Sequence, residues 1–391
     1  MKTMMHFLIY VFGPFFAMCL AQDAVVRINV TNPAGFSRSN ETISIQWSKV
    51  SAVLSAGTKS VVVTDGSSGK EILSQIFDEN LDGKPDALLF QSDFAPHETK
   101  VFTVAAVSGT PAPPTSLVDA RYVEPREDVA WENDRIAYRM YGPALAAEVD
   151  NGIDVWTKRV RYLIVKKWYE GEEQTPKIIY HIDHGEGADF FDVGRSLGCG
   201  GSGIWHNNRV YQAGVFSSYK IVSTGPIRAC FELYYNKWNI DGASLKETKR
   251  ITLDAGQNLN RISVTFSGGA NDRTIDLACG LVKRPNTKPY TNTENGWMSL
   301  WGQTNDSLPN GDLGTGVVFQ PNKLIRTTED SSQYLMLAKT KIGSSFNYAA
   351  GAGWTRSGDF TSVDDWNGYL NRWALLQRWP LVIKISTKKG N

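Results

Sequence analysis

Apolar and polar residues alternate in short runs along most of this chain. Residues 24–107 contain the runs VVRINV, TISIQW, KSVVVTD, ALLFQ and KVFTVAAV, separated by clusters of Gly, Asn, Asp and Ser. Because successive side chains of a strand point to opposite faces, this alternation predicts strands that each bury one face. The first hundred residues therefore predict an antiparallel β unit.

Longer runs of the same kind fill the remainder of the chain. They include FSSYKIVSTGPIRACFELYYNKW and ETKRITLDAGQNLNRISVTFSG within 212–268, and later TGVVFQ, QYLMLAKT and PLVIKIST. Their length and period predict a broad antiparallel sheet. One helix is expected near the end, where Ser362 and Asp365 form a capping box before WNGYLNRWALLQRW. The predicted class is all-β with few short helices.

The domain organisation follows from two unusual segments. Residues 1–21 have Lys2 near the start, an apolar run and small residues before Gln22, which predicts a signal peptide and export, most simply to the periplasm. The Pro-rich segment 109–116 is predicted to link an N-terminal β unit (22–108) to a larger domain (117–391) that carries the active site. No membrane anchor is expected, since Gly and Pro interrupt the one apolar run.

Composition narrows the classes of partner. The formal net charge is +1 over 391 residues, so no large single-sign field is available to recruit nucleic acid. Removal of the signal would leave Cys199, Cys230 and Cys279. This odd number excludes a disulfide framework, and buried free thiols are expected.

Residues 180–211 concentrate the side chains that carry proton-transfer chemistry. This stretch has three of the five histidines, together with carboxylates, arginines and tyrosines that could act on an anionic substrate. Its glycines would let backbone approach a ligand closely. The alternative is a set of structural histidines beside a tight β connection. The members considered are Tyr180, His181, Asp183, His184, Glu186, Asp189, Asp192, Arg195, His206, Asn207, Arg209 and Tyr211.

The same residues could instead bind a divalent metal. His181 and His184 with Asp183 could hold zinc, but residues three apart in a straight strand point to opposite faces, so the chain would have to bend at Gly185. The loop 78–86 resembles a calcium loop, or alternatively a solvated Asx/Gly turn. The expected chemistry itself requires no cofactor.

Residues 121–161 mix charged and aromatic side chains in a way that suits a sugar-binding cleft. Trp131 could stack on a pyranose, or could equally pack in the core. Arg159 and Arg161 are predicted to share one strand face, with Lys158 on the other, and such a cationic pair would suit a uronate.

Four stretches give the chain a family resemblance: WENDRIAYRMYGPAL, GIDVWTKRV, YHIDHGEGADFFDVGRSLGCGGSGIW and GWTRSGDF. With them, most of the mature chain resembles the DUF4861 family of exported bacterial proteins. The resemblance implies a large antiparallel β-supersandwich of the galactose-mutarotase type. It also implies a role in breaking down polysaccharides that contain uronic acids, such as ulvan and pectin, in clusters like those of marine Bacteroidota.

One activity that the resemblance implies is that of an oligosaccharide dehydratase. Such an enzyme removes water across C4–C5 of the non-reducing-end uronate, and an unsaturated glycuronyl hydrolase then removes the 4,5-unsaturated sugar. Two alternatives stay open: a polysaccharide lyase that cleaves the glycosidic bond by the same elimination, and a carbohydrate-binding or mutarotase-like protein without elimination chemistry.

Elimination needs a cation at the C6 carboxylate, a base for H5 and an acid for the leaving oxygen at C4. In glucuronate, H5 and O4 lie on one face of the ring, so a single group can serve both transfers; iduronate and galacturonate need two. The residues assigned to these roles are Arg209 or Arg195 with Asn207 at the carboxylate, His206 or His184 as base, Tyr211 or Tyr180 as acid, Asp189 or Asp183 to orient an imidazole, and Arg159 and Trp131 as further substrate contacts.

Overall fold

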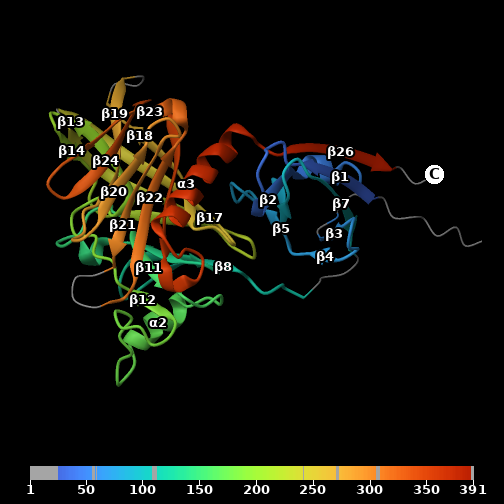
Figure 1. Cartoon of the computed structure of the whole chain (residues 1–391), viewed down its shortest axis with the longest axis horizontal. Helices are drawn as coiled ribbons and strands as arrows, with labels where there is room; N and C mark the ends of the chain where they lie inside the picture. Colours follow the sequence, from blue (N-terminus) through green and yellow to red (C-terminus); the bar gives the residue numbers. More distant parts are fainter. Residues whose placement is uncertain are drawn as a thin grey trace, which may run out of the picture.

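A computed structural model of the chain describes residues 25–54, 58, 60–107, 112–240, 242–269, 273–304 and 309–388. The predicted signal peptide lies outside these ranges, as does the start of the predicted linker. Most of the regular structure is antiparallel β-sheet, which confirms the predicted class (Figure 1). Among the described residues, no helix combines the length and apolar character needed to cross a bilayer.

The N-terminal unit consists of two small sheets around one core. One sheet has the order β26-β1-β7-β3-β4 and the other β2-β6-β5. Ile28, Phe90 and Phe102 are fully buried between them. The elements are β1 (Val25–Thr31), β2 (Arg38–Gln46), α1 (Trp47–Ser51), β3 (Val61–Asp65), β4 (Glu71–Ile72), β5 (Ser74–Phe77), β6 (Ala87–Phe94), β7 (Thr99–Ala106) and β26 (Val382–Lys388).

The last strand corrects the predicted domain division. β26 pairs with β1 over all seven residues from Val25 to Thr31, so the C-terminus completes the N-terminal unit instead of ending in the larger domain (Figure 1). Without β26, β1 would be an edge strand with unpaired backbone groups. A Pro-rich connection alone therefore does not separate the two units, because the chain crosses between them twice.

The larger domain is a sandwich of two antiparallel sheets. Its eight-stranded sheet has the order β15-β16-β17-β18-β25-β22-β21-β20, and its five-stranded sheet has the order β14-β13-β19-β24-β23. Apolar side chains of both sheets, such as Phe231, Ile262 and Leu277, form one continuous core. The strands are β13 (Cys199–His206), β14 (Arg209–Tyr211), β15 (Ser218–Thr224), β16 (Arg228–Ile240), β17 (Ala243–Asp254), β18 (Leu259–Ser267), β19 (Thr274–Val282), β20 (Lys288–Asn292), β21 (Trp297–Gln303), β22 (Asp312–Phe319), β23 (Leu324–Glu329), β24 (Gln333–Lys341) and β25 (Ser345–Trp354).

Helix α3 (Val363–Arg378) confirms the predicted cap, because Ser362 Oγ accepts a hydrogen bond from the Asp365 amide at 3.2 Å. The helix packs on the outer face of β21 and β22. It comes so close that a Cβ on Gly314 would lie 2.5 Å from the Trp366 ring. The three described cysteines are free and buried, also as expected.

A further sheet, of order β12-β11-β10-β9-β8, carries the polar residues discussed next. One face of it joins the sandwich core through Val129, Tyr138 and Val155. Helix α2 (Val165–Glu172), which the sequence pattern did not predict, covers the other face, and Figure 1 shows α2 beside β11 and β12. The strands are β8 (Val118–Val123), β9 (Asp128–Asn133), β10 (Ala137–Met140), β11 (Asp154–Lys158) and β12 (Gly187–Asp189).

Candidate functional site

Strand pairing gathers one arginine and three aspartates on the α2-facing side of this sheet. Arg139 pairs with Asp154 on one neighbouring strand and with Ala130 on the other, and Asp189 pairs with Trp156. Since alternate residues share a face, Asp128 lies on the same side as its strand neighbour Ala130. Four ionisable groups from four strands thus meet beneath α2.

Arg139 is the centre of this group. Its Nη2 lies 2.7 Å from Asp154 Oδ2 and 2.9 Å from Asp189 Oδ2, and its Nη1 lies 3.7 Å from Asp128 Oδ2. Arg139 Nη2 donates to the Tyr141 hydroxyl at 3.3 Å, and Nη1 donates to the Tyr180 hydroxyl at 3.2 Å. The Tyr169 hydroxyl donates to Asp128. All of these residues are buried. We call Asp128, Arg139, Tyr141, Asp154, Tyr169, Tyr180 and Asp189 the Arg139 cluster.

The Arg139 cluster holds more carboxyl groups than one guanidinium neutralises. Burial raises the pKa of Asp128 to about 6, although Arg139 and the Tyr169 hydroxyl act against it. Burial, followed by the charge of Asp154, raises the pKa of Asp189 well above its usual value. Asp128 Oδ1 is buried and has no hydrogen-bond partner among the described residues. The cluster can therefore retain a proton near neutral pH, as acid–base sites do.

One histidine connects the buried cluster to solvent. His181 Nδ1 lies 3.2 Å from the Asp189 carbonyl oxygen and 3.5 Å from Asp189 Oδ2, while 57% of the His181 side chain is exposed. The imidazole also packs on Tyr180, with ring centroids 4.6 Å apart. Because Nδ1 faces Asp189, Nε2 is the nitrogen available to a substrate. The Asp189 carbonyl oxygen thus orients the imidazole, and an imidazole fixed through Nδ1 in this way is a common arrangement for a general base.

The loop that carries His181 is held by its own polar groups. Asp183 Oδ1 accepts from the amides of Gly185 at 2.8 Å and Gly187 at 3.1 Å, and the Asp183 carboxylate forms an ion pair with Arg159. Gly187 has φ +112°, and a Cβ there would lie 2.0 Å from the Thr157 carbonyl oxygen. Only glycine fits this close approach.

The residues considered for metal binding do not converge. Asp183 faces Arg159, His181 faces Asp189, and His184 is exposed. Among the residues with described positions, no group of three or more His, Cys, Asp or Glu could hold a metal ion. In the 78–86 loop the side chains accept backbone amides, as in Asp82 Oδ1 with Lys84 N two residues on at 2.8 Å, so the structure shows Asx turns there.

The second half of the 180–211 stretch lies elsewhere. His206 and Arg209 flank a tight turn at Asn207 and Asn208, both with positive φ, and Arg209 lies 4.3 Å above the ring of Tyr211. Figure 1 shows β13 and β14 at the end of the sandwich away from β12 and α2. An eight-residue strand spans roughly 26 Å, so β13 itself separates the two groups. The expectation of one site built from the whole stretch is wrong.

Three other predicted substrate contacts are engaged within the protein. Trp131 is fully buried, and its Nε1 donates to Asn260 Oδ1 at 2.7 Å, so it is a core residue and not a sugar platform. Arg195 is exposed and pairs with Asp150 at 3.2 Å. Arg159 is 35% exposed and lies 5.6 Å from the Trp354 ring, beside the His181 loop.

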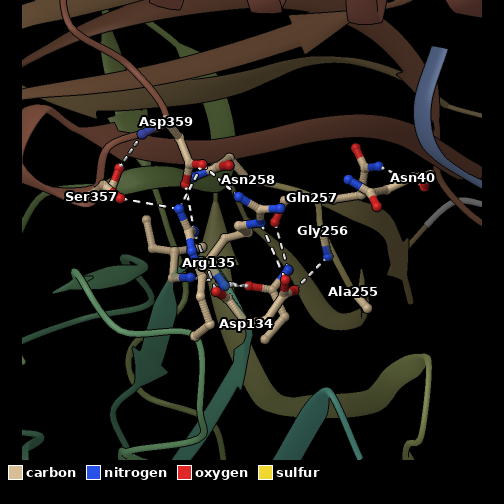
Figure 2. Close-up of polar contacts among 12 residues, drawn as sticks. Asn40, Asp134, Arg135, Ala255, Gly256, Gln257, Asn258, Ser357 and Asp359 are labelled. Atoms are coloured by element: carbon tan, nitrogen blue, oxygen red, sulfur yellow. Dashed lines mark hydrogen bonds and ion pairs between the residues drawn. The ribbon is translucent and has the colours of Figure 1, made fainter. Parts of the chain in front are cut away.

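Two of the stretches that carry the family resemblance, WENDRIAYRMYGPAL and GWTRSGDF, meet at Asp359. Arg135 Nη1 donates to Asp359 Oδ1 at 2.5 Å, and Arg161 binds both oxygens at 2.8 and 2.9 Å. Figure 2 shows Arg135 facing Asp359 while Asp134 turns to the Gly256 amide, which donates to Asp134 Oδ1 at 2.6 Å. Arg161 therefore does not form the expected cationic pair with Arg159. Arg161 instead anchors the segment after β25 through Asp359. Lys158 is buried against Glu132 at 2.7 Å.

Sequence reasoning placed Asp128 and Arg139 only in the general mixture of a sugar-binding cleft, and it did not identify Asp154. A signal exists in DVAWEN, AYRM and DVWTK, where ionisable residues occupy one face of strands that are otherwise apolar. All fifteen of these residues are buried, so their charged members must meet one another.

Replacing Asp128 by asparagine is expected to change how stability depends on pH. In the folded protein the pKa of this carboxyl is raised by burial from 3.8 to about 6, so between these values the folded state binds more protons than the unfolded state. Wild-type stability should fall as pH rises through this window and stay lowered above it. Asp128→Asn should lack this contribution and be more stable above about pH 6, by up to about 3 kcal/mol.

Urea unfolding across the pH range measures this effect. Asparagine keeps an acceptor for the Tyr169 hydroxyl, which lies 3.0 Å from Asp128 Oδ2, so packing is preserved. An unchanged slope of unfolding free energy against pH in Asp128→Asn would show that Asp128 is already ionised in the folded protein.

Comparison with known proteins gives a family and a fold. The sequence profile described as "Domain of unknown function (DUF4861)" matches residues 30–383. A relative named "Uncharacterized protein P7", from Formosa agariphila, is 32% identical over 390 residues, covering 95% of this chain and 96% of the relative.

Two solved structures from Enterococcus faecalis share the fold. One is a protein in glycosyl hydrolase family 38, with a TM-score of 0.50 and 11% identity, and the other is an α-mannosidase, with a TM-score of 0.51 and 10% identity. The matches cover 94% and 93% of this chain, but only 48% and 46% of those chains. The chain thus spans about half the length of each, and the likeness concerns the sandwich architecture.

Proposed function

This chain belongs to the DUF4861 family, and on that basis we propose that it is a carbohydrate-active enzyme. Its reaction is the elimination of water across C4–C5 of the non-reducing-end uronic acid of an oligosaccharide such as those from ulvan, which gives a 4,5-unsaturated uronate. The observation that carries the proposal is His181, an exposed imidazole held by the buried Asp189, which Arg139 holds in turn.

The proposed elimination uses His181 for both proton transfers. Neutral His181 Nε2 takes H5, the electron pair of the C5–H bond forms the C4=C5 double bond, and the C4–O4 bond breaks. The resulting imidazolium returns the proton to O4, which leaves as water. One group suffices where H5 and O4 lie on the same face, so we expect glucuronate to be preferred over iduronate and galacturonate.

Arg159 is assigned to the substrate carboxylate. It is 35% exposed, and its contact with Asp183 holds it against the loop that carries His181. A guanidinium at the C6 carboxylate acidifies H5, because it stabilises the negative charge that develops there during proton removal. Behind His181, the Asp189 carbonyl oxygen accepts from Nδ1–H as the imidazolium forms, and Tyr180 packs against the imidazole ring.

The wider setting is part of the same proposal. The protein acts after export, in the periplasm, and its product passes to an unsaturated glycuronyl hydrolase. The proposed steps use side chains alone and no cofactor.

Saturated oligosaccharides with a non-reducing-end glucuronate or iduronate provide the test. Ultraviolet absorbance reports the unsaturated uronate, and mass spectrometry reports chain length. Rising absorbance with loss of one water and no shorter product supports the proposal. Shorter products would replace it with the lyase alternative, and no change on any uronate substrate would favour a binding or mutarotase-like protein.

A further inference from the structure

A groove lies between α3 and the outer face of the eight-stranded sheet. It has a volume of about 330 Å³. Its floor comes from β17, β18 and β25, and its wall comes from the C-terminal half of α3. It shares no residue with the Arg139 cluster, the His181 loop or the Asp359 junction.

The register of three strands builds the floor. Arg250 pairs with Ser263, which pairs in turn with Asn347, so these three side chains form one row across the sheet. Arg261 stands in the next row, opposite Thr252. Neighbouring apolar residues point into the core, and strand alternation therefore leaves the polar row outside.

Helix α3 supplies an aromatic wall. Its first half is buried against β22 through Trp366 and Leu370. Trp373 and Gln377 follow one turn apart, where the helix passes over the open part of the sheet, and both line the groove. Trp373 is half-buried, so its indole presents one side to the groove.

Two arginines and a buried side-chain donor line the groove. Of the described residues that line it, Arg250 and Arg261 are charged and none is a carboxylate. Glu232 pairs with Arg250 at 2.7 Å and Asp254 pairs with Arg261 at 2.8 Å, both from neighbouring positions on the same outer face of the sheet, and Glu79 lies 3.6 Å from Arg250. Arg261 remains 46% exposed. Gln377 Nε2 is buried and has no hydrogen-bond partner among the described residues.

We propose that this groove is a second binding site, which anchors an acidic oligosaccharide away from the reacting sugar. A pyranose stacks on Trp373, an anionic oxygen group binds Arg261 and Arg250, and hydroxyls bind Gln377, Asn347 and Ser263. The anionic group is a uronate carboxylate or a sulfate ester, which share this chemistry. The inference takes its substrate class from the proposed function, but it does not depend on the elimination step.

Calorimetric titration of the full chain tests the proposal. The ligands are two saturated oligosaccharides of equal length, one with uronate only and one that also carries sulfate, and the His181→Ala background prevents turnover. Arg261→Gln and Trp373→Ala are each expected to weaken binding about tenfold or more. A loss for both ligands identifies the carboxylate as the bound group, and a loss for the sulfated ligand alone identifies the sulfate ester.

Two further variants keep the outcome interpretable. Asn347→Trp fills the groove from an exposed strand position without removing core packing, and it should also weaken binding. Trp379→Ala removes a 50% exposed tryptophan that lies outside the groove and should leave Kd unchanged. Unchanged Kd values for Arg261→Gln and Asn347→Trp with both ligands would overturn the proposal.

The two proposals fail separately. If wild-type protein yields no unsaturated product but groove variants still lose binding, the elimination is refuted and the groove stands. If product forms and the groove variants bind normally, the groove is refuted and the elimination stands.

Discussion

Replacing His181 by alanine is expected to lower the turnover of a saturated glucuronate oligosaccharide by about 10²–10⁴-fold, the usual contribution of a positioned acid–base group. The reason is that His181 presents an exposed ring nitrogen while Nδ1 is held by the Asp189 carbonyl oxygen at 3.2 Å. The rate of unsaturated product formation, measured by ultraviolet absorbance, gives the effect. Binding of the substrate should change much less, because the carboxylate contact at Arg159 remains.

His184→Ala is the matched control for this experiment. His184 is an exposed histidine on the same loop, and the structure places Asp189 against His181 and not against His184. The control should keep nearly wild-type turnover. Equal losses in the two variants would mean that the loop as a whole matters and not the His181–Asp189 pair. An active His181→Ala protein would remove His181 from the mechanism.

Replacing Arg139 by methionine is expected to destabilise the protein by about 3–5 kcal/mol, the usual cost of removing one partner from a buried ion pair. Arg139 is the cation that the buried carboxyls of Asp128, Asp154 and Asp189 share. Without it, their ionised forms are buried and repel one another. The deficit should be smaller near about pH 5 than near about pH 8, because burial raises the pKa of Asp128 and Asp189 and their protonation at lower pH removes part of the repulsion. Urea unfolding at both pH values measures it.

Arg195→Ala is the control for the loss of stability expected in Arg139→Met. Its ion pair with Asp150 has an arginine side chain that is 57% exposed, so its loss should cost at most about 1 kcal/mol. If Arg139→Met cost no more than Arg195→Ala, the Arg139 cluster would not be the electrostatic unit described above. Recovery of stability in Arg139→Met with Asp154→Asn would support shared repulsion as the cause.

Part of this architecture follows from local pattern alone. Alternation over β16, β17 and β18 predicts strands because each buries one face, and the Ser362–Asp365 cap depends only on groups within one turn. The same holds for the turn chemistry of the 78–86 loop, where side chains bind amides two to five residues away. Helix α2 escaped prediction because its aromatic and charged residues match neither period over only eight positions.

The candidate site depends on pairings that no local pattern contains. Sequence reasoning identified His181 and Asp189 as useful residues, but it placed them with His206 and Tyr211, which β13 carries to the other end of the sandwich. Arg139 was considered only as a cleft residue, because its role at the centre of the cluster depends on partners from β9, β11 and β12. Such partners are set by strand order and register.

The sequence by itself determined where strands, turns and the α3 cap occur, because these depend on neighbours within a few residues. The tertiary structure decided that β26 returns to β1, that Trp131 is core, and that one buried arginine gathers three aspartates beneath α2. The physical reason is that burial and charge pairing depend on which strands lie side by side. That choice is made by packing of the whole chain around its cores.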